Sequence, residues 1–130
     1  MSSESLHAPR EVLSTDTRLL HNAITSLKEE LDAVDWYRQR ADDTEDEALK
    51  GLLLHNMREE MEHASMLLEW IRRNNGDFAG HLETYLFSTG SILATERVAE
   101  GRPPESPSEA GTSEPSGGHT VTIGSLKGRR

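Results

Sequence analysis

Residues 20–34 read LHNAITSLKEELDAV, and the spacing of their apolar side chains decides the fold. The large apolar residues recur at intervals of four, three, four and three: Leu20, Ile24, Leu27, Leu31 and Val34. These intervals are typical of an amphipathic α-helix that presents one apolar stripe. Ser14 or Thr15 can cap the helix at its start. The pattern predicts that the helix runs to about Ala41.

A second amphipathic helix is predicted between Thr44 and the turn at Asn74, Asn75 and Gly76. Thr44 with Glu47 fits a capping box at its start, and the Asn-Asn-Gly sequence is a plausible stop. Its apolar stripe contains Leu49, Leu53, Ala64, Leu67 and Ile71. No proline occurs between Arg10 and Arg102, so long helices are permitted in this region.

Two long helices joined by a short loop are expected to form an antiparallel hairpin. A shorter third helix is predicted from Phe78, Leu82, Tyr85 and Leu86. A hairpin has two layers of side chains and cannot enclose a core, and only 34% of the residues are hydrophobic. We therefore expect an all-α fold in which two hairpins pair as a homodimer and build a four-helix bundle.

The composition excludes several classes of function. The net charge of −9 disfavours nucleic acid as a partner. The absence of cysteine excludes disulfides, thiolate zinc sites and cysteine nucleophiles. We expect no membrane association, because no apolar run approaches the roughly 20 residues of a membrane span. The polar N-terminus carries no signal-peptide pattern, so a cytoplasmic location is expected.

The chain divides into four predicted segments. Residues 1–13 are expected to be a flexible N-terminus, and residues 14–97 the helical domain. Residues 98–119 are predicted to be a flexible linker, since from Gly101 to His119 most residues are Gly, Pro, Ser or Thr. Residues 120–130 form a short segment of alternating apolar residues with a basic end, a composition that suits a tethered peptide for a partner's groove.

Three ionisable residues fall on the predicted inward faces at one level. Glu30 lies within the apolar arc of the first helix, and Glu60 lies in the middle of that of the second. His63 follows Glu60 at about 60° around the same helix. If the loop is centred near residue 43, Glu30 lies opposite residue 57, within about one turn of Glu60. A carboxylate in a core needs a partner or a proton, so a shared site is indicated.

Glu30, Glu60 and His63 together suit a metal centre. Ferritin-like di-metal bundles use one Glu from each of two helices and Glu-x-x-His from each of the other two. One chain supplies half of this set through Glu30, Glu60 and His63, and a two-fold dimer supplies all of it. Carboxylates with one imidazole per metal suit iron or manganese, and zinc could also bind. Tyr37 lies two turns from Glu30 on nearly the same line and could support the metal.

Structural alternatives remain open for each residue. Glu30 and Glu60 could be core ions paired with Arg or Lys, although neither helix offers an inward basic residue at that level. His63 could be a satisfied core histidine, and Tyr37 a packing residue. Glu29 and Asp32 lie on another face of the first helix, where carboxylates could collect cations or simply be solvated.

Several blocks resemble the encapsulated ferritins. The first spans Glu29 to Tyr37, the second Glu59 to Ala64, and the third Leu68 to Arg73. Thr84 to Phe87 is also similar to this family. The segment from Ile123 to Lys127 is similar to the cargo-loading peptides that dock inside encapsulin shells.

The resemblance implies a ferroxidase that oxidises Fe(II) with dioxygen at a di-iron site, with two ions per dimer. It implies a ring-shaped decamer built from dimers, located inside an encapsulin nanocompartment that stores the iron. By position, Glu30, Glu60 and His63 would be ligands with Tyr37 close by. Glu29 and Asp32 would flank the access route of the metal. The encapsulin shell protein would be the partner of residues 120–130.

Two other functions compete with this interpretation. The chain could be a non-catalytic helical scaffold or cargo protein whose inward carboxylates are structural. Alternatively, it could keep the di-metal site and act as a peroxidase or in peroxide disproportionation. The oxidant and the native metal therefore stay open at this point.

Overall fold

The computed structural model describes residues 6–103, and within this range every regular element is helical. The predicted all-α class is therefore confirmed. The order is η2 (Arg10–Val12), α1 (Thr15–Asp43), α2 (Glu47–Asn74), α3 (Gly76–Tyr85) and α4 (Ile92–Ala99). Three predictions concern residues outside the described range: the segment 120–130, the disordered C-terminal tail, and most of the linker 98–119. None of the described helices is long and apolar enough to cross a lipid bilayer.

α1 begins where the sequence predicted. The hydroxyl of Ser14 accepts a hydrogen bond from the backbone N–H of Thr17 at 3.1 Å, as an N-cap residue does. The helix continues to Asp43, two residues beyond the predicted end at Ala41. Thr44 then ends it, and its N–H still donates to the carbonyl of Arg40.

The predicted start of α2 was wrong by two residues. Asp46, and not Thr44, is the N-cap, and its carboxylate accepts from the N–H of Leu49 at 2.7 Å. Thr44 serves as the C-cap of α1, and its hydroxyl accepts from the N–H of Asp46 at 3.3 Å. A carboxylate also gains from the positive end of the helix dipole, which favours Asp46 at this position.

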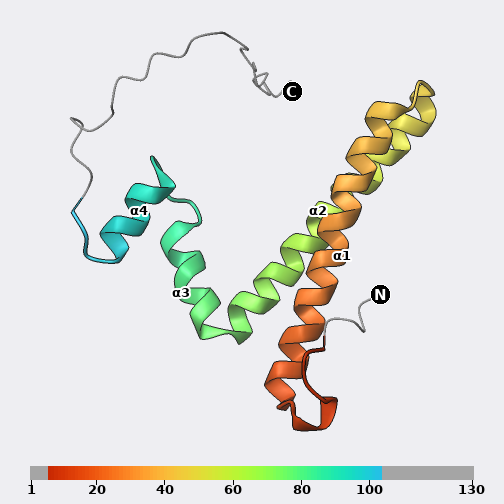
Figure 1. The fold of residues 1–130 in the computed structure, drawn as a ribbon. Coiled ribbons are helices and arrows are strands. Elements are labelled where there is room, and N and C mark those ends of the chain that lie inside the picture. The colour runs from red at the N-terminus through yellow and green to blue at the C-terminus, as the bar shows by residue number, and fades with distance from the viewer. Residues whose placement is uncertain (1–5, 104–130) are drawn as a thin grey trace, which may run out of the picture.

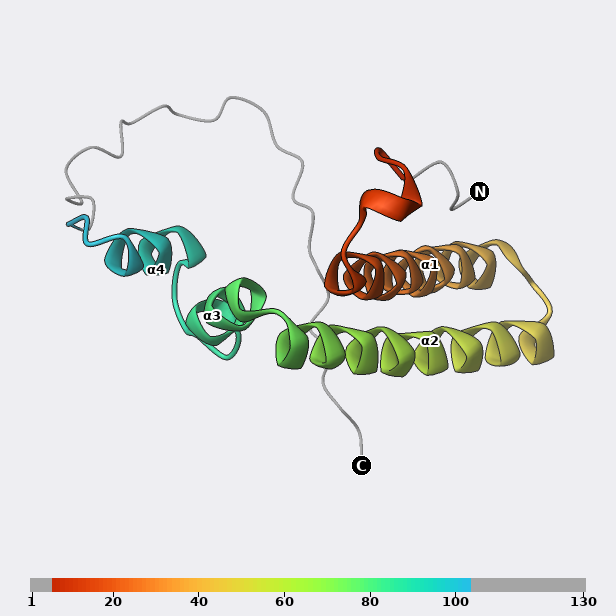
Figure 2. The same cartoon turned by 90° about the horizontal axis from the view of Figure 1, so that it is seen from below.

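α1 and α2 lie side by side and run antiparallel, which confirms the hairpin (Figures 1 and 2). The contact line between them is buried and consists of Ala23 and Ala41 on α1 and of Met57, Ala64 and Ile71 on α2. Small alanine side chains allow the two helices to approach closely.

The flanks of the hairpin are open. Leu31 and Leu49 were predicted on the inward faces, but they are 53% and 45% exposed. The periodicity identified the apolar arc correctly, but a two-helix contact covers only the centre of a broad arc. The apolar residues at the edges of that arc therefore stay uncovered in the single chain.

α3 and α4 form an arm that projects away from the hairpin (Figure 1). We use "arm" for α3, α4 and the connecting residues 86–91. Asn75 ends α2 and caps α3 by accepting from the N–H of Phe78 at 2.9 Å. α4 was not distinguished in the sequence analysis, and Ser91 caps it by accepting from the N–H of Ala94 at 3.2 Å.

Candidate metal centre

The hairpin brings Glu30 of α1 together with Glu60 and His63 of α2. One ligand atom from each lies within 4.8 Å of the others, and within residues 6–103 this is the one group of His, Asp and Glu that converges in this way. The three side chains converge because of the position of the loop between Asp43 and Glu47. Its centre is residue 45, which is equally far along the chain from Glu30 and Glu60. An antiparallel hairpin with this loop therefore places the two glutamates opposite each other.

His63 connects the two carboxylates. Its Nδ1 lies 3.2 Å from Oε2 of Glu60 and 3.7 Å from Oε2 of Glu30. Glu60 and His63 are three residues apart, so they are neighbours on the surface of α2. The side chains of Glu30, Glu60 and His63 are 26%, 23% and 44% exposed. The cluster is thus half-buried on one flank of the hairpin.

The two carboxyl groups are electrostatically linked. The pKa of Glu30 is raised from its ordinary value, chiefly by its hydrogen bond to Glu60, with burial and the Glu60 charge adding to the effect. The pKa of Glu60 is lowered, because it accepts the hydrogen bond from Glu30 and interacts favourably with His63. Two carboxylates this close repel each other when both are charged, and a bound metal cation would relieve that repulsion.

No Arg or Lys side chain forms an ion pair with Glu30 or Glu60 among the described residues. The ion pairs of Glu30 and Glu60 within residues 6–103 are both formed with His63. Arg38 pairs instead with Asp42, and Arg72 and Arg73 pair with Glu69. The structural alternative of a core ion pair with Arg or Lys therefore has no support in the described geometry.

Tyr37 does not belong to the cluster of three. It lies seven residues after Glu30 on α1, which is about 10 Å along the helix axis. The guanidinium of Arg40 lies 5.8 Å from the centre of its ring. Tyr37 is half-buried and lies on the same flank as Glu30, because seven residues complete almost two turns.

Glu29 and Asp32 also lie away from the cluster. Both are exposed. Glu29 is about 100° and Asp32 about 160° around α1 from Glu30, on its outer surface. Trp36, which shares that surface, is 51% exposed. These two carboxylates are exposed to solvent in the single chain. Their role in collecting cations stays a prediction.

The donor set fits a hard or borderline divalent cation. Two carboxylates and one imidazole are ligands that iron, manganese and zinc accept. Three donors leave at least one coordination position free in the preferred geometries of these ions. Because the open flank faces away from the chain's own core, the remaining donors would have to come from solvent or from another molecule.

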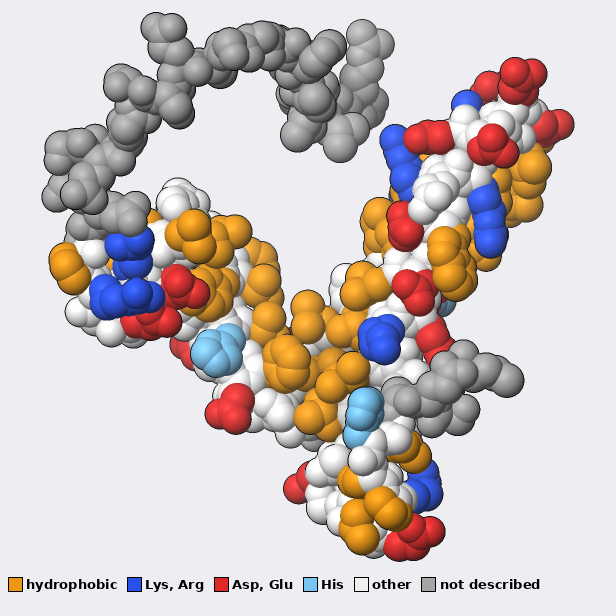
Figure 3. All heavy atoms as spheres, in the orientation of Figure 1, with side chains coloured by type: hydrophobic (Ala, Val, Ile, Leu, Met, Phe, Trp, Pro, Cys, Tyr) orange, Lys and Arg blue, Asp and Glu red, His pale blue; other side chains and the backbone are white. Residues whose placement is uncertain are grey.

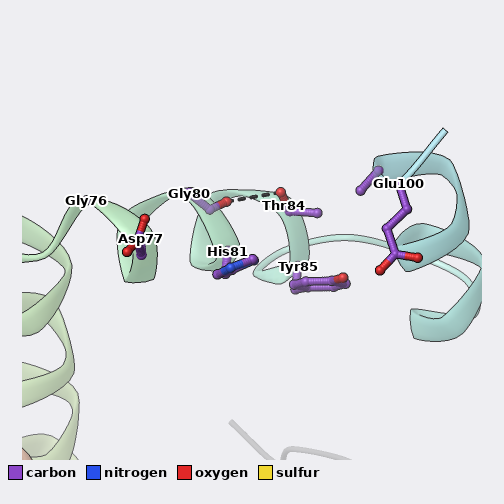
Figure 4. A pocket seen from close by; sticks show the side chains of 8 residues that line it. Gly76, Asp77, Gly80, His81, Thr84, Tyr85 and Glu100 are labelled. Carbon is purple, nitrogen blue, oxygen red and sulfur yellow. Dashed lines mark hydrogen bonds between the residues drawn. The ribbon is translucent and has the colours of Figure 1, made fainter.

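A second polar hollow lies between α3 and α4 (Figure 4). It encloses about 360 Å³, and it is lined by Gly76, Asp77, Gly80, His81, Thr84, Tyr85, Ala99 and Glu100. The hydroxyl of Thr84 donates to the carbonyl of Gly80 at 3.0 Å. Asp77, His81 and Glu100 do not converge as the hairpin cluster does. The sequence analysis did not identify this hollow, because it depends on the position of α4.

Known proteins are similar to this chain over most of its length. Residues 5–89 match the model of a family described as EncFtn-like. The chain is 47% identical over 127 residues to an "Encapsulated ferritin-like protein" of Rhodospirillum rubrum, covering 98% of this chain and 91% of that protein. It is 32% identical over 123 residues to the "Encapsulin nanocompartment cargo protein EncC" of Myxococcus xanthus, covering 92% and 91%.

A solved structure supports the same fold. The crystal structure of protein ne0167 from Nitrosomonas europaea matches with a TM-score of 0.66 and 50% sequence identity. The match covers 68% of this chain and 97% of that chain. The similarity therefore includes nearly all of the crystallised protein.

Proposed function

Because this chain belongs to the EncFtn-like family, we propose that it is a ferroxidase that oxidises Fe(II) to Fe(III) with dioxygen. Its di-iron site is completed across a homodimer interface, and the oxidised iron is stored inside an encapsulin nanocompartment. Iron is both the substrate and the cargo of the protein. The observation that carries this proposal is the convergence of Glu30, Glu60 and His63 within 4.8 Å on an open flank.

The donor set supports this chemistry. Glu30 and Glu60 offer anionic oxygens, which favour Fe(III) over Fe(II) because the higher charge is stabilised more strongly by negative ligands. His63 offers one imidazole nitrogen per metal ion. Each Fe(II) gives up one electron, and dioxygen is the electron acceptor. The protons that the ligands release on binding metal leave through the solvent-exposed flank.

A second copy of the chain would complete the ligand set. One hairpin supplies two carboxylates and one imidazole, which is half of the four carboxylates and two imidazoles of ferritin-like di-metal bundles. A two-fold axis through the open flank places the second half opposite the first. Assembly and metal binding are then thermodynamically linked.

Three further residues have supporting roles in this proposal. Tyr37 lies on the same flank, two turns from Glu30, where it can donate a hydrogen bond toward the paired site. Glu29 and Asp32 are exposed carboxylates on the outer surface of α1. They attract Fe(II) from solvent and raise its local concentration near the site.

The names of two relatives support an encapsulin shell protein as the partner. The Rhodospirillum rubrum protein is called encapsulated, and the Myxococcus xanthus protein is called an encapsulin cargo protein. We propose that residues 120–130 bind the encapsulin shell, with the preceding Gly-, Pro- and Ser-rich residues as a tether. The dimers then assemble into a ring-shaped decamer inside the compartment.

Anaerobic addition of Fe(II) followed by air tests the enzymatic part. The wild-type protein is expected to form a ferric absorption band rapidly, and Glu60→Ala to lose this phase. Glu59→Ala is the matched control, because its carboxylate is half-exposed and pairs with His55 on the outside of α2. A fast ferric band that survives in Glu60→Ala would refute the site. Faster turnover with hydrogen peroxide than with dioxygen would favour the peroxidase alternative.

A further inference from the structure

The arm contains a groove between α3 and α4 that the proposed iron chemistry does not use. Two adjacent hollows of about 360 and 450 Å³ make up this groove, and both are lined by Thr84 and Ala99. Apolar side chains lie over the surface of the arm (Figure 3). We name the two hollows together the arm groove. Grooves on helical surfaces commonly hold peptide segments.

The two halves of the arm groove differ in charge. Asp77 and Glu100 lie at opposite ends of the first hollow (Figure 4), and no Lys or Arg lines it. Arg102 donates a hydrogen bond to Glu100, whereas Asp77 forms no ion pair with another described residue of the chain. The second hollow is lined only by uncharged residues, among them Ala94 and Val98. The groove therefore has an uncharged half next to an acidic half, in which one carboxylate is not neutralised.

The terminal segment 120–130 has the complementary order of side chains. Its apolar residues come first and its basic residues last, and it contains no Asp or Glu: Val121, Ile123, Leu126, Lys127, Arg129 and Arg130. A peptide with this sequence can place its apolar side chains in the uncharged hollow and its basic end against the acidic hollow. The opposite charges favour this direction of binding over the reverse one.

The terminal segment is attached close to the arm groove. α4 ends at Ala99, which lines both hollows, and residues 104–119 connect the described part of the chain to Thr120. A Gly- and Ser-rich chain of this length has a root-mean-square reach of roughly 20–25 Å. α3 and α4 have ten and eight residues, so they are about 15 and 12 Å long. The whole arm groove thus lies within reach of the chain's own terminal segment.

We propose that residues 120–130 dock into the arm groove of the same chain, with their apolar side chains in the uncharged hollow and their basic end against Asp77. A short tether gives the segment an effective concentration on the order of 1 mM at the groove. A contact with an intrinsic dissociation constant of about 0.1 mM is then occupied about nine-tenths of the time. Even a weak contact is therefore enough for docking.

The docked segment acts as an autoinhibitory contact. A segment that is free about one-tenth of the time binds a partner about tenfold more weakly than a segment that is always free. This consequence rests on the proposed function, because residues 120–130 are the segment that we assign to the encapsulin shell. The docking itself requires neither the shell nor iron.

Disulfide trapping in the full-length, metal-free protein tests the docking. The chain has no cysteine, so one introduced pair reports one contact. Ala94→Cys puts a thiol in the uncharged hollow, and Ser125→Cys puts one in the terminal segment. Leu93→Cys with Ser125→Cys is the matched control, because Leu93 is the preceding residue on α4 and is 70% exposed but lines neither hollow.

The two pairs close loops of nearly equal length, so a freely moving segment would react at both positions at similar rates. Docking predicts that the disulfide forms at least about tenfold faster at position 94 than at position 93. Asp77→Asn is expected to slow the reaction at position 94 several-fold, as is Arg129→Glu combined with Arg130→Glu. Asp35→Asn removes the same charge from an exposed position on α1 and should leave the rate unchanged. Circular dichroism verifies that each variant keeps the helicity of wild type.

Three results would overturn the inference. The first is an equal rate of disulfide formation at positions 94 and 93. The second is a disulfide that joins two chains, detected by mass spectrometry of mixed labelled and unlabelled protein, because the groove would then hold the segment of another copy. The third is an Asp77→Asn protein that reacts as fast as Asp35→Asn.

Binding to isolated encapsulin shells distinguishes this inference from the proposed function. Ala94→Arg fills the uncharged hollow and repels the basic segment, so this variant is expected to bind shells about tenfold more tightly than wild type. Equal binding of the two proteins would contradict the autoinhibition. If neither protein binds shells while the disulfide at position 94 still forms rapidly, the proposed partner is refuted and the docking is supported.

Discussion

Replacing Glu60 by glutamine is expected to remove most of the stability that the chain gains from metal. Glutamine has nearly the same shape as glutamate, so the half-buried position keeps its packing. It has no charge and is a weaker ligand, however. Glu60 is one of only three donors in the half-site, and its Oε2 lies 3.2 Å from Nδ1 of His63. The substitution therefore leaves one carboxylate and one imidazole per chain.

The size of the effect follows from linkage. Free metal at about 100 times the dissociation constant stabilises a folded protein by about 2.7 kcal/mol per site. Loss of a supporting group around a metal commonly weakens binding by about 10- to 100-fold, and a lost ligand costs at least as much. At about 100-fold weaker binding, the same metal concentration contributes only about 0.4 kcal/mol. For a domain of this size, the rise in Tm falls from roughly 10–20 °C to roughly 2–3 °C.

Thermal unfolding followed by circular dichroism, with and without anaerobic Fe(II), measures this difference. Glu59→Gln is the control, because it makes the same chemical change one residue away, on the outer surface of α2. Its side chain is 50% exposed and lies 3.7 Å from His55. The reasoning is refuted if Fe(II) raises Tm equally in Glu60→Gln and wild type. It is also refuted if Glu59→Gln loses as much as Glu60→Gln.

Four other outcomes are expected. Metal-free Glu30→Gln should melt at a higher temperature than wild type at pH 7 but not at pH 4 in thermal scans. The raised pKa of Glu30 stabilises the folded state only at low pH, and this contribution is lost as pH rises through the folded pKa. The pKa of Glu69 is lowered to about 2 by its two arginine partners. Urea midpoints of wild type and Glu69→Gln should thus differ most above about pH 4.5 and converge as pH falls toward 2. Ile71 is 1% exposed, so urea unfolding of Ile71→Ala should show a loss of about 3 kcal/mol, whereas Met66→Ala, at a 57% exposed position, should change little. Deletion of residues 120–130 should leave iron oxidation intact and abolish co-purification with encapsulin shells.

The hairpin could be predicted because local signals agreed with each other. The apolar spacing, the cap at Ser14 and the double asparagine before Gly76 each specify a helix or its end from adjacent residues alone. The start of α2 was wrong because Thr44 and Asp46 are both good caps, and the sequence does not show which of them the end of α1 occupies. α4 was missed because its few turns carry too short a pattern to separate from the linker.

The candidate centre was predicted for a reason of chain geometry. The expected loop centre at residue 43 placed Glu30 opposite residue 57, within about one turn of Glu60. The observed loop is centred on residue 45, so Glu30 and Glu60 lie opposite each other, and His63 follows on the same surface. The burial of Leu31 and Leu49 could not be predicted in the same way, because it depends on how much of each apolar arc a partner covers. The roles of Tyr37 and the outer carboxylates depend on that partner too.

The central claim is that two copies of the chain share one di-iron site. Native mass spectrometry of the full-length protein, titrated with Fe(II) under anaerobic conditions, tests it most directly. The account predicts that iron appears on species with two chains, or multiples of two, at one ion per chain, and that Glu60→Gln strongly reduces this uptake. Single chains that saturate with two irons each, or pairs that hold no more iron in wild type than in Glu60→Gln, would contradict it.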